Sequence, residues 1–187
     1  MRLIRYVLIA LVGLWLVGEV AAIPVAERLI EQEVDGRYRD AASVDVDIDS
    51  FPLVARVLLT EKVRRLTVTL ARVARQEITF ADVRFELSGI VVDRAAILRG
   101  NPRVKEIDRG SVTTTIDVGA LGGIASLTGA DVRVSGRTLY AGSLTAKIDN
   151  DLVPCPPQAR VVAGDRIILS CEIEEFPEAL LKAVQRG

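Results

Sequence analysis

The chain opens on a strongly apolar run. Arg2 and Arg5 precede it, it is uncharged from Tyr6 to Gly18, and Glu19 interrupts it. A short basic region followed by about 7–15 apolar residues is typical of an export signal, whereas a helix that crosses a membrane needs roughly 20 apolar residues. Two interpretations follow: a signal peptide that is cleaved after Ala22, or a retained anchor with Glu19 near the outer interface.

Beyond this run, apolar and polar residues alternate in many short segments. Between Ser43 and Asp49, valine and isoleucine take one side and aspartate takes the other, which is the pattern of a half-buried β-strand. The same kind of alternation predicts strands in the segments 66–70, 83–87, 112–118, 132–134, 140–148, 159–163 and 166–173.

Helical spacing is confined to a few stretches. Pro24 suits the first turn of a helix, Leu29, Ile30 and Val34 follow at helical spacing, and Gly36 is a reasonable end. Further short helices or loop insertions are predicted at 51–59, 94–99 and 118–127, with a last helix at 177–185.

These elements predict an α+β fold. Many antiparallel strands with one solvated face need a cover over the apolar face, and the N-terminal and C-terminal helices are available for it. We expect residues 1–22 to be the signal peptide or membrane anchor, and residues 23–187 to form one exported domain of the cell envelope or periplasm.

The only two cysteines, Cys155 and Cys171, flank a predicted hairpin. Strands at 159–163 and 166–170 surround Gly164-Asp165, and a turn there pairs positions whose numbers add up to between 326 and 328. Because 155 and 171 add up to 326, the two thiols fall opposite or nearly opposite each other. We predict a structural disulfide, which agrees with an oxidising compartment outside the cytoplasm.

The composition argues against catalysis and against nucleic acid as a partner. A chain without histidine has no Ser-His-Asp triad, no Cys-His dyad and no imidazole ligand for a metal. We therefore expect no catalytic residue, no metal and no cofactor. The 24 basic and 25 acidic residues also lack the basic excess that binding to nucleic acid needs.

The three aspartates at 45, 47 and 49 do not form a calcium loop. An EF-hand loop that began at Asp45 would need glycine at its sixth position and glutamate at its twelfth, where the chain has Ser50 and Arg56. The aspartates are interpreted as the solvated side of a strand.

Two apolar segments leave a choice between packing and membrane contact. Residues 51–59 and the glycine-rich stretch 119–127 are interpreted either as packed short helices or as an apolar lip that touches a membrane. In the second case, the contacting residues are Leu53, Val57, Leu58, Leu121, Ile124 and Leu127. Basic residues at 64–75 and 94–109 leave a similar choice between a solvated face and a rim that holds an anionic lipid head group.

Several of these segments together resemble the LmeA-like phospholipid-binding family of actinobacterial envelope proteins. The resemblance lies in Phe51-Pro52-Leu53 through Leu70, in 82–90 and in 107–116, and it spans roughly residues 24 to 175. Leu87-Ser88-Gly89-Ile90 stands where the family has a Leu-x-Gly-Val-like motif, and Gly110-Ser111-Val112-Thr113 matches a later one. The chain departs from the family pattern in the order of Phe51-Pro52-Leu53 and in having Val112-Thr113 where an aromatic residue is frequent.

The resemblance implies a curved antiparallel sheet wrapped on a long N-terminal helix, similar to tubular lipid-binding domains. It also implies phospholipid and a membrane surface as partners, and a role in lipid or glycolipid transfer or maturation. Because aliphatic residues are abundant and aromatic ones make up only 4%, we expect an acyl-chain site beneath the sheet. We predict that it is lined by Leu66, Val68, Val83, Phe85, Leu87, Ile116 and Leu144. The alternative is an exported structural or assembly protein with a packed core and no small ligand.

Overall fold

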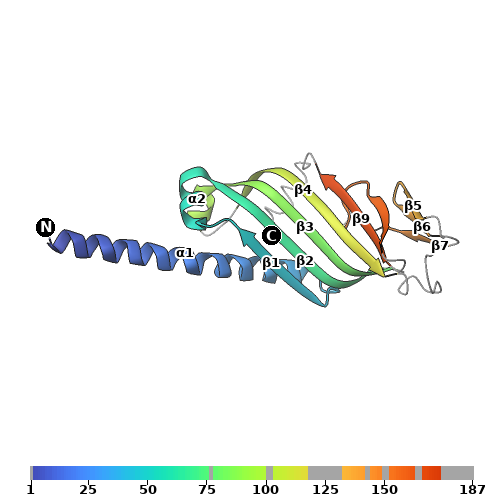
Figure 1. The fold of residues 1–187 in the computed structure, drawn as a ribbon, viewed down its shortest axis with the longest axis horizontal. Helices are drawn as coiled ribbons and strands as arrows, with labels where there is room; N and C mark the ends of the chain where they lie inside the picture. The colour runs from blue at the N-terminus through green and yellow to red at the C-terminus, as the bar shows by residue number, and fades with distance from the viewer. Residues whose placement is uncertain are drawn as a thin grey trace.

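The computed structural model describes residues 2–75, 78–99, 103–117, 132–141, 144–148, 152–162 and 166–173. A long helix, α1 (Arg2–Arg37), leads into a strongly curved sheet, and its N-terminal part projects beyond the body of the molecule (Figure 1). A small second sheet lies at the opposite end of the molecule (Figure 1).

The large sheet has six antiparallel strands in the order β1-β2-β3-β4-β9-β8. The first four strands follow one another along the chain, and β9 pairs with both β4 and β8. Their bounds are β1 Ser43–Asp49, β2 Lys62–Arg75, β3 Ile78–Val92, β4 Val104–Asp117, β8 Gln158–Val162 and β9 Arg166–Ile173.

The register gives this sheet one apolar and one polar face. Directly paired residues point to the same side of a sheet, so Val46, Val68 and Phe85 share one face, and Val112 and Cys171 continue it. The intervening positions, such as the exposed aspartates of β1, lie on the other face.

Shorter elements lie at the two ends of this sheet. The helices α2 (Leu53–Thr60) and α3 (Arg94–Leu98) lie at the end from which α1 projects (Figure 1). The small sheet consists of β5 (Val132–Ser135), β6 (Thr138–Ala141) and β7 (Leu144–Lys147), in that order. Its buried residues Leu139 and Ala141 belong to the same core as the large sheet.

These elements confirm the predicted α+β fold with a curved antiparallel sheet, including the strand at 43–49 and the short helices near 51–59 and 94–99. The prediction that a helix begins at Pro24 is wrong, because Pro24 lies inside the continuous helix α1. Proline leaves the carbonyl four residues earlier without its helical partner, and here both Pro24 and Val20 are exposed, so water can reach that carbonyl. The predicted helices at 118–127 and 177–185 and the turn at 163–165 lie outside the described residues.

Candidate functional site

The apolar face of the large sheet is fully buried along one half of its strands. Leu70 and Val83 are paired across β2 and β3, and both are 0% exposed. Ile116, Ile167 and Leu169 on β4 and β9 are equally buried. We call this set of residues the closed half.

Part of the cover of the closed half comes from the small sheet and from the segment before β8, and α1 contributes further residues to the same core cluster. Leu139, Ile148, Leu152 and Val153 are buried in the same core cluster as the closed half. The Arg137 guanidinium holds this cover in place, because it donates hydrogen bonds to the carbonyls of Val153 and Pro154.

The same apolar face is only half-buried toward α2 and α3. Leu66 and Leu87 are directly paired, the next pair along the strands is Val68 with Phe85, and Ile173 extends the face on β9. Leu66, Phe85, Leu87 and Ile173 are half-buried, whereas Val68 is 8% exposed. We call these five residues the open half.

The structure therefore brings most of the predicted acyl-chain residues onto one face. Leu66, Val68, Phe85 and Leu87 lie in the open half, while Val83 and Ile116 lie in the packed closed half. Leu144 begins β7, and its side chain is outside the described residues.

The disulfide between Cys155 and Cys171 is confirmed, with the two Cα atoms 5.8 Å apart. Cys171 lies on β9 between the open and closed halves, and Cys155 lies in the segment before β8. The bridge thus joins the cover of the closed half covalently to the sheet.

A buried carboxylate connects α1 to α2. Glu19 is 0% exposed, and its two oxygens accept hydrogen bonds from the backbone N–H groups of Val54 and Ala55, at 2.9 and 2.7 Å. The residue before α2 is Pro52, whose side chain makes no capping hydrogen bond, so Glu19 satisfies donors of the first helical turn from a distant part of the chain.

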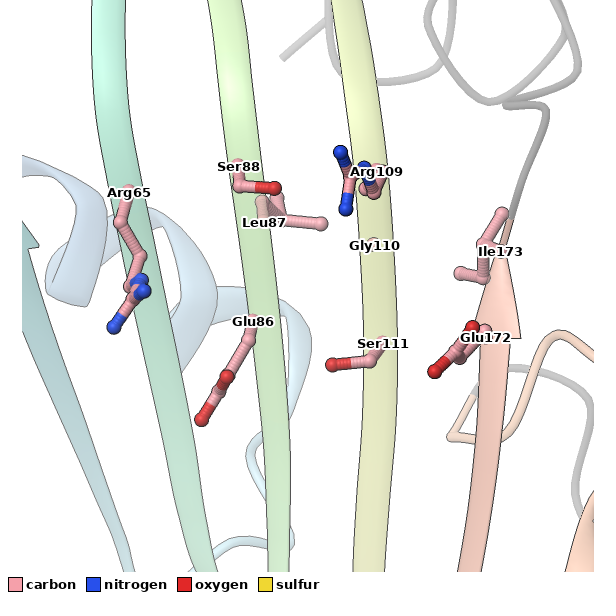
Figure 2. Close-up of a pocket in the computed structure, with 9 residues that line it drawn as sticks. All are labelled: Arg65, Glu86, Leu87, Ser88, Arg109, Gly110, Ser111, Glu172 and Ile173. Carbon is pink, nitrogen blue, oxygen red and sulfur yellow. The ribbon is translucent and has the colours of Figure 1, made fainter.

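An open hollow of about 530 Å³ is lined mainly by residues of the polar face, and Leu87, Gly110 and Ile173 also belong to its lining. Figure 2 shows Glu86, Ser111 and Glu172 in one row across β3, β4 and β9, with Arg65, Ser88 and Arg109 nearby. Two arginines face two glutamates here, and Glu86 is paired with Arg84 at 2.8 Å. The formal charges of the basic and acidic side chains that line the hollow therefore balance.

The predicted membrane-contacting residues of α2 take different positions. Leu53 is buried and Val57 is half-buried against the core, whereas Leu58 is 39% exposed. Leu121, Ile124 and Leu127 lie outside the described residues.

Three features of this region were not found in the sequence. The sequence marks Glu19 as an interruption of the apolar run and, for a retained anchor, as a residue near the outer interface, because nothing local shows that its partners lie 35 and 36 residues away. Ile173 could have been assigned to the acyl-chain site from its alternation with Cys171. The exposure of Phe51, Leu59 and Leu98 depends on how α2 and α3 pack, which periodicity does not report.

The motif Leu87-Ser88-Gly89-Ile90 has a local structural reason. Gly89 has a φ of +64°, and a Cβ at this position would stand 2.6 Å from the Cβ of Asp108 on the neighbouring strand. Only glycine fits a left-handed conformation so close to β4, where it lets the two strands stay paired on both sides.

In this antiparallel α+β domain, one half of the aliphatic face of the sheet is incompletely covered. Domains with such a surface can bind an apolar ligand. The model of the LmeA-like phospholipid-binding family matches residues 17–183, and the chain belongs to this family. This membership supports lipid binding and phospholipid as a partner. No curated protein and no solved structure gives a significant match. Within the described part of the chain, no helix is long and apolar enough to cross a membrane.

Proposed function

We propose that this protein binds a phospholipid whose acyl chains lie on the open half of the sheet, in the cell envelope after export. The observation that carries this proposal is the change in burial along one continuous apolar face. Leu70 and Val83 are completely covered, whereas Leu66 and Leu87, on the same two strands, are not. Covering such aliphatic surface with acyl chains is favourable by about 25 cal/mol per Å².

In this proposal, Leu66, Phe85 and Leu87 contact the acyl chains directly, and Val68 lies at the base of the site. Val83 and Ile116 form its packed end, since both side chains already have no exposed surface. Ile173 on β9, which is paired with Gly110 of β4, lines one side of the proposed site. Glycine at 110 leaves room beside Leu87, its partner on β3.

The proposal includes attachment of the mature protein to a membrane through its N-terminal apolar run. Cleavage after Ala22 would remove Glu19 and leave the N–H groups of Val54 and Ala55 without their acceptors. Ala22 and Ile23 also pack against the core, on either side of that cleavage point. The family match begins before Glu19, which agrees with a helix that stays part of the domain.

Native mass spectrometry of the full-length protein, purified in a mild detergent and incubated with phosphatidylglycerol, tests the proposed lipid site. The wild type is expected to carry added mass that corresponds to bound lipid. Leu87→Trp fills the open half without adding charge and should remove most of that mass. Ser88→Trp places the same indole one residue away, on the polar face, where Ser88 lines the 530 Å³ hollow, and it should leave the lipid load unchanged.

Equal lipid loads in both tryptophan variants would place the lipid elsewhere. A second variant, Phe85→Asp, puts a carboxylate into the site at a cost of several kcal/mol, and it should also carry no lipid. Circular dichroism must show that each variant keeps its strand content. A folded wild type that never carries lipid would instead support the structural or assembly role.

A further inference from the structure

The end of the domain from which α1 projects exposes a group of apolar side chains. We call residues 51–64, 92–99 and 103–106 the α2–α3 end. Among the described residues, seven large apolar side chains are exposed, and four of them lie at this end. They are Phe51 at 58%, Leu58 at 39%, Leu59 at 81% and Leu98 at 71% exposure.

The α2–α3 end is also positively charged. It holds seven basic and three acidic residues, in a chain whose net charge is −1. Glu61 forms ion pairs with Lys105 at 2.8 Å and with Arg94 at 3.8 Å. The exposed side chains of Lys62, Arg64, Arg99 and Arg103 form no ion pair within the part of the chain that the structure describes.

Several contacts hold this end together. The Arg94 guanidinium donates to the carbonyl of Leu58 at 2.5 Å, which joins α3 to the last turn of α2. The hydrogen bond from Lys105 to Glu61 raises the pKa of Lys105, and the N–H of Ala96 lowers the pKa of Asp93. The apolar side chains of the two helices are therefore presented from one fixed unit.

The position of the α2–α3 end relative to α1 indicates that this end faces the membrane that would hold the apolar run. Figure 1 shows the N-terminal part of α1 running out past α2 and α3. The apolar run from Tyr6 to Gly18 belongs to that part and is about 20 Å long as a helix, which is long enough to enter a bilayer whose hydrocarbon core is about 30 Å thick. A bilayer that holds this run lies on the side of the α2–α3 end.

We propose that the α2–α3 end docks on the surface of an anionic phospholipid bilayer. Phe51, Leu58, Leu59 and Leu98 enter the boundary between head groups and acyl chains, and Lys62, Arg64, Arg99 and Arg103 contact the phosphates. This inference rests on the proposed attachment to a membrane, and it goes beyond lipid uptake because it fixes which end of the domain meets the bilayer. The open half of the sheet lies toward the same end, so its lipid has a short path from the bilayer.

A single added cysteine can test this docking, because both native cysteines are held in the disulfide. The full-length Leu98→Cys variant is labelled with an environment-sensitive dye and reconstituted into vesicles of phosphatidylcholine and phosphatidylglycerol in equal amounts. Quenchers attached to the lipid chains should quench the dye. The same dye on Ser135→Cys, an exposed position on β5 at the opposite end, should stay unquenched.

The charge contribution is tested with Arg99→Gln and Arg103→Gln combined. A basic side chain near an anionic surface contributes about 1 kcal/mol, so losing two should weaken docking about 25-fold. The matched control combines Arg133→Gln and Lys147→Gln in the small sheet and should leave the quenching unchanged.

Equal quenching at positions 98 and 135, or equal quenching in vesicles of phosphatidylcholine alone, would overturn the docking proposal. The lipid load of the Arg99→Gln, Arg103→Gln variant is measured by native mass spectrometry in detergent. A normal load with lost quenching supports docking as a separate property. A load that falls together with the quenching would overturn the assignment of these arginines to the bilayer surface, since they would then belong to the lipid site.

Discussion

The closed and open halves lie on the same strands but differ in what completes them. In the closed half, Leu70 and Val83 are covered by other residues of the chain, and Arg137 and the disulfide hold one part of this cover in place. In the open half, Leu66 and Leu87 have the same aliphatic character and keep part of their surface exposed. The difference teaches that one hydrophobic pattern can supply both stability and a binding surface, depending on whether the fold brings a cover to it.

The largest effect is expected from a leucine truncation in the closed half. Leu70→Ala should lower the free energy of unfolding by about 2–5 kcal/mol, because it leaves a cavity in a packed core. Leu87→Ala in the open half should cost about half as much or less, since part of that side chain is already exposed. Chemical denaturation of the two variants under identical conditions measures both values, and equal losses would remove the distinction between the halves.

Removal of the disulfide should have the next largest effect. Changing Cys155 and Cys171 together to serine releases a bridge that spans 16 residues, which should lower the free energy of unfolding by about 3 kcal/mol. The lipid load should survive if the variant is folded, because the bridge holds the cover of the closed half. A double variant as stable as the wild type would show that the cover is held without a contribution from the disulfide.

Loss of the hydrogen bonds that cap α2 should destabilise the protein less, and mainly near α2. Glu19→Gln keeps one oxygen acceptor and loses the charge at the helix N-terminus. The free energy of unfolding should therefore fall by about 1.5–3 kcal/mol. Hydrogen exchange of the Val54 and Ala55 amides should become faster than in the wild type. Glu33→Gln, at an exposed position of α1, is the control and should leave the exchange rates of both amides unchanged.

The smallest expected effect is the loss of the Asp93 cap on α3 at low pH. Asp93 accepts a hydrogen bond from the N–H of Ala96, which lowers its pKa in the folded protein below the ordinary 3.8. A lowered pKa means that the carboxylate stabilises α3 above pH about 3.8 and that this contribution is lost as pH falls through the folded value. NMR titration should show the Ala96 amide responding in this range and the Leu169 amide of the closed half unaffected. An Asp93→Asn variant should lose the Ala96 response, and its persistence would assign the titration to another group.

Much of the sheet could be predicted from sequence because its signal is local. The alternation between Ser43 and Asp49 is a property of neighbouring residues, and it sets which side chains face inward whatever the partner strand. The pairing of Cys155 with Cys171 was predictable for a related reason, since a hairpin fixes distances over few residues. The extent of α1 was not, because Pro24 is a helix-start signal that long-range packing overrides.

Burial within the candidate site was beyond sequence analysis. Val83 and Leu87 look equivalent in the alternating pattern, yet one is fully covered and the other is not. That difference depends on segments that are distant in sequence and meet in one core, among them α1, the small sheet and the segment around Val153. The bond between Glu19 and α2 depends on the same kind of distant encounter.

The continuity of α1 has a mechanical consequence. No loop separates its apolar beginning from the part that packs on the domain, and the stretch from Gly18 to Arg37 alone is about 30 Å of helix. A tethered domain on a flexible linker would search a wide volume, whereas a domain fixed along a rigid helix can only turn about the helix axis. Pro24 is no hinge between the two, because Glu19, Ala22 and Ile23, which precede it, already contact the domain. In the proposed attachment to a membrane, such a mount would keep the domain close to that membrane, and any partner that exchanges lipid with it would have to approach the same place.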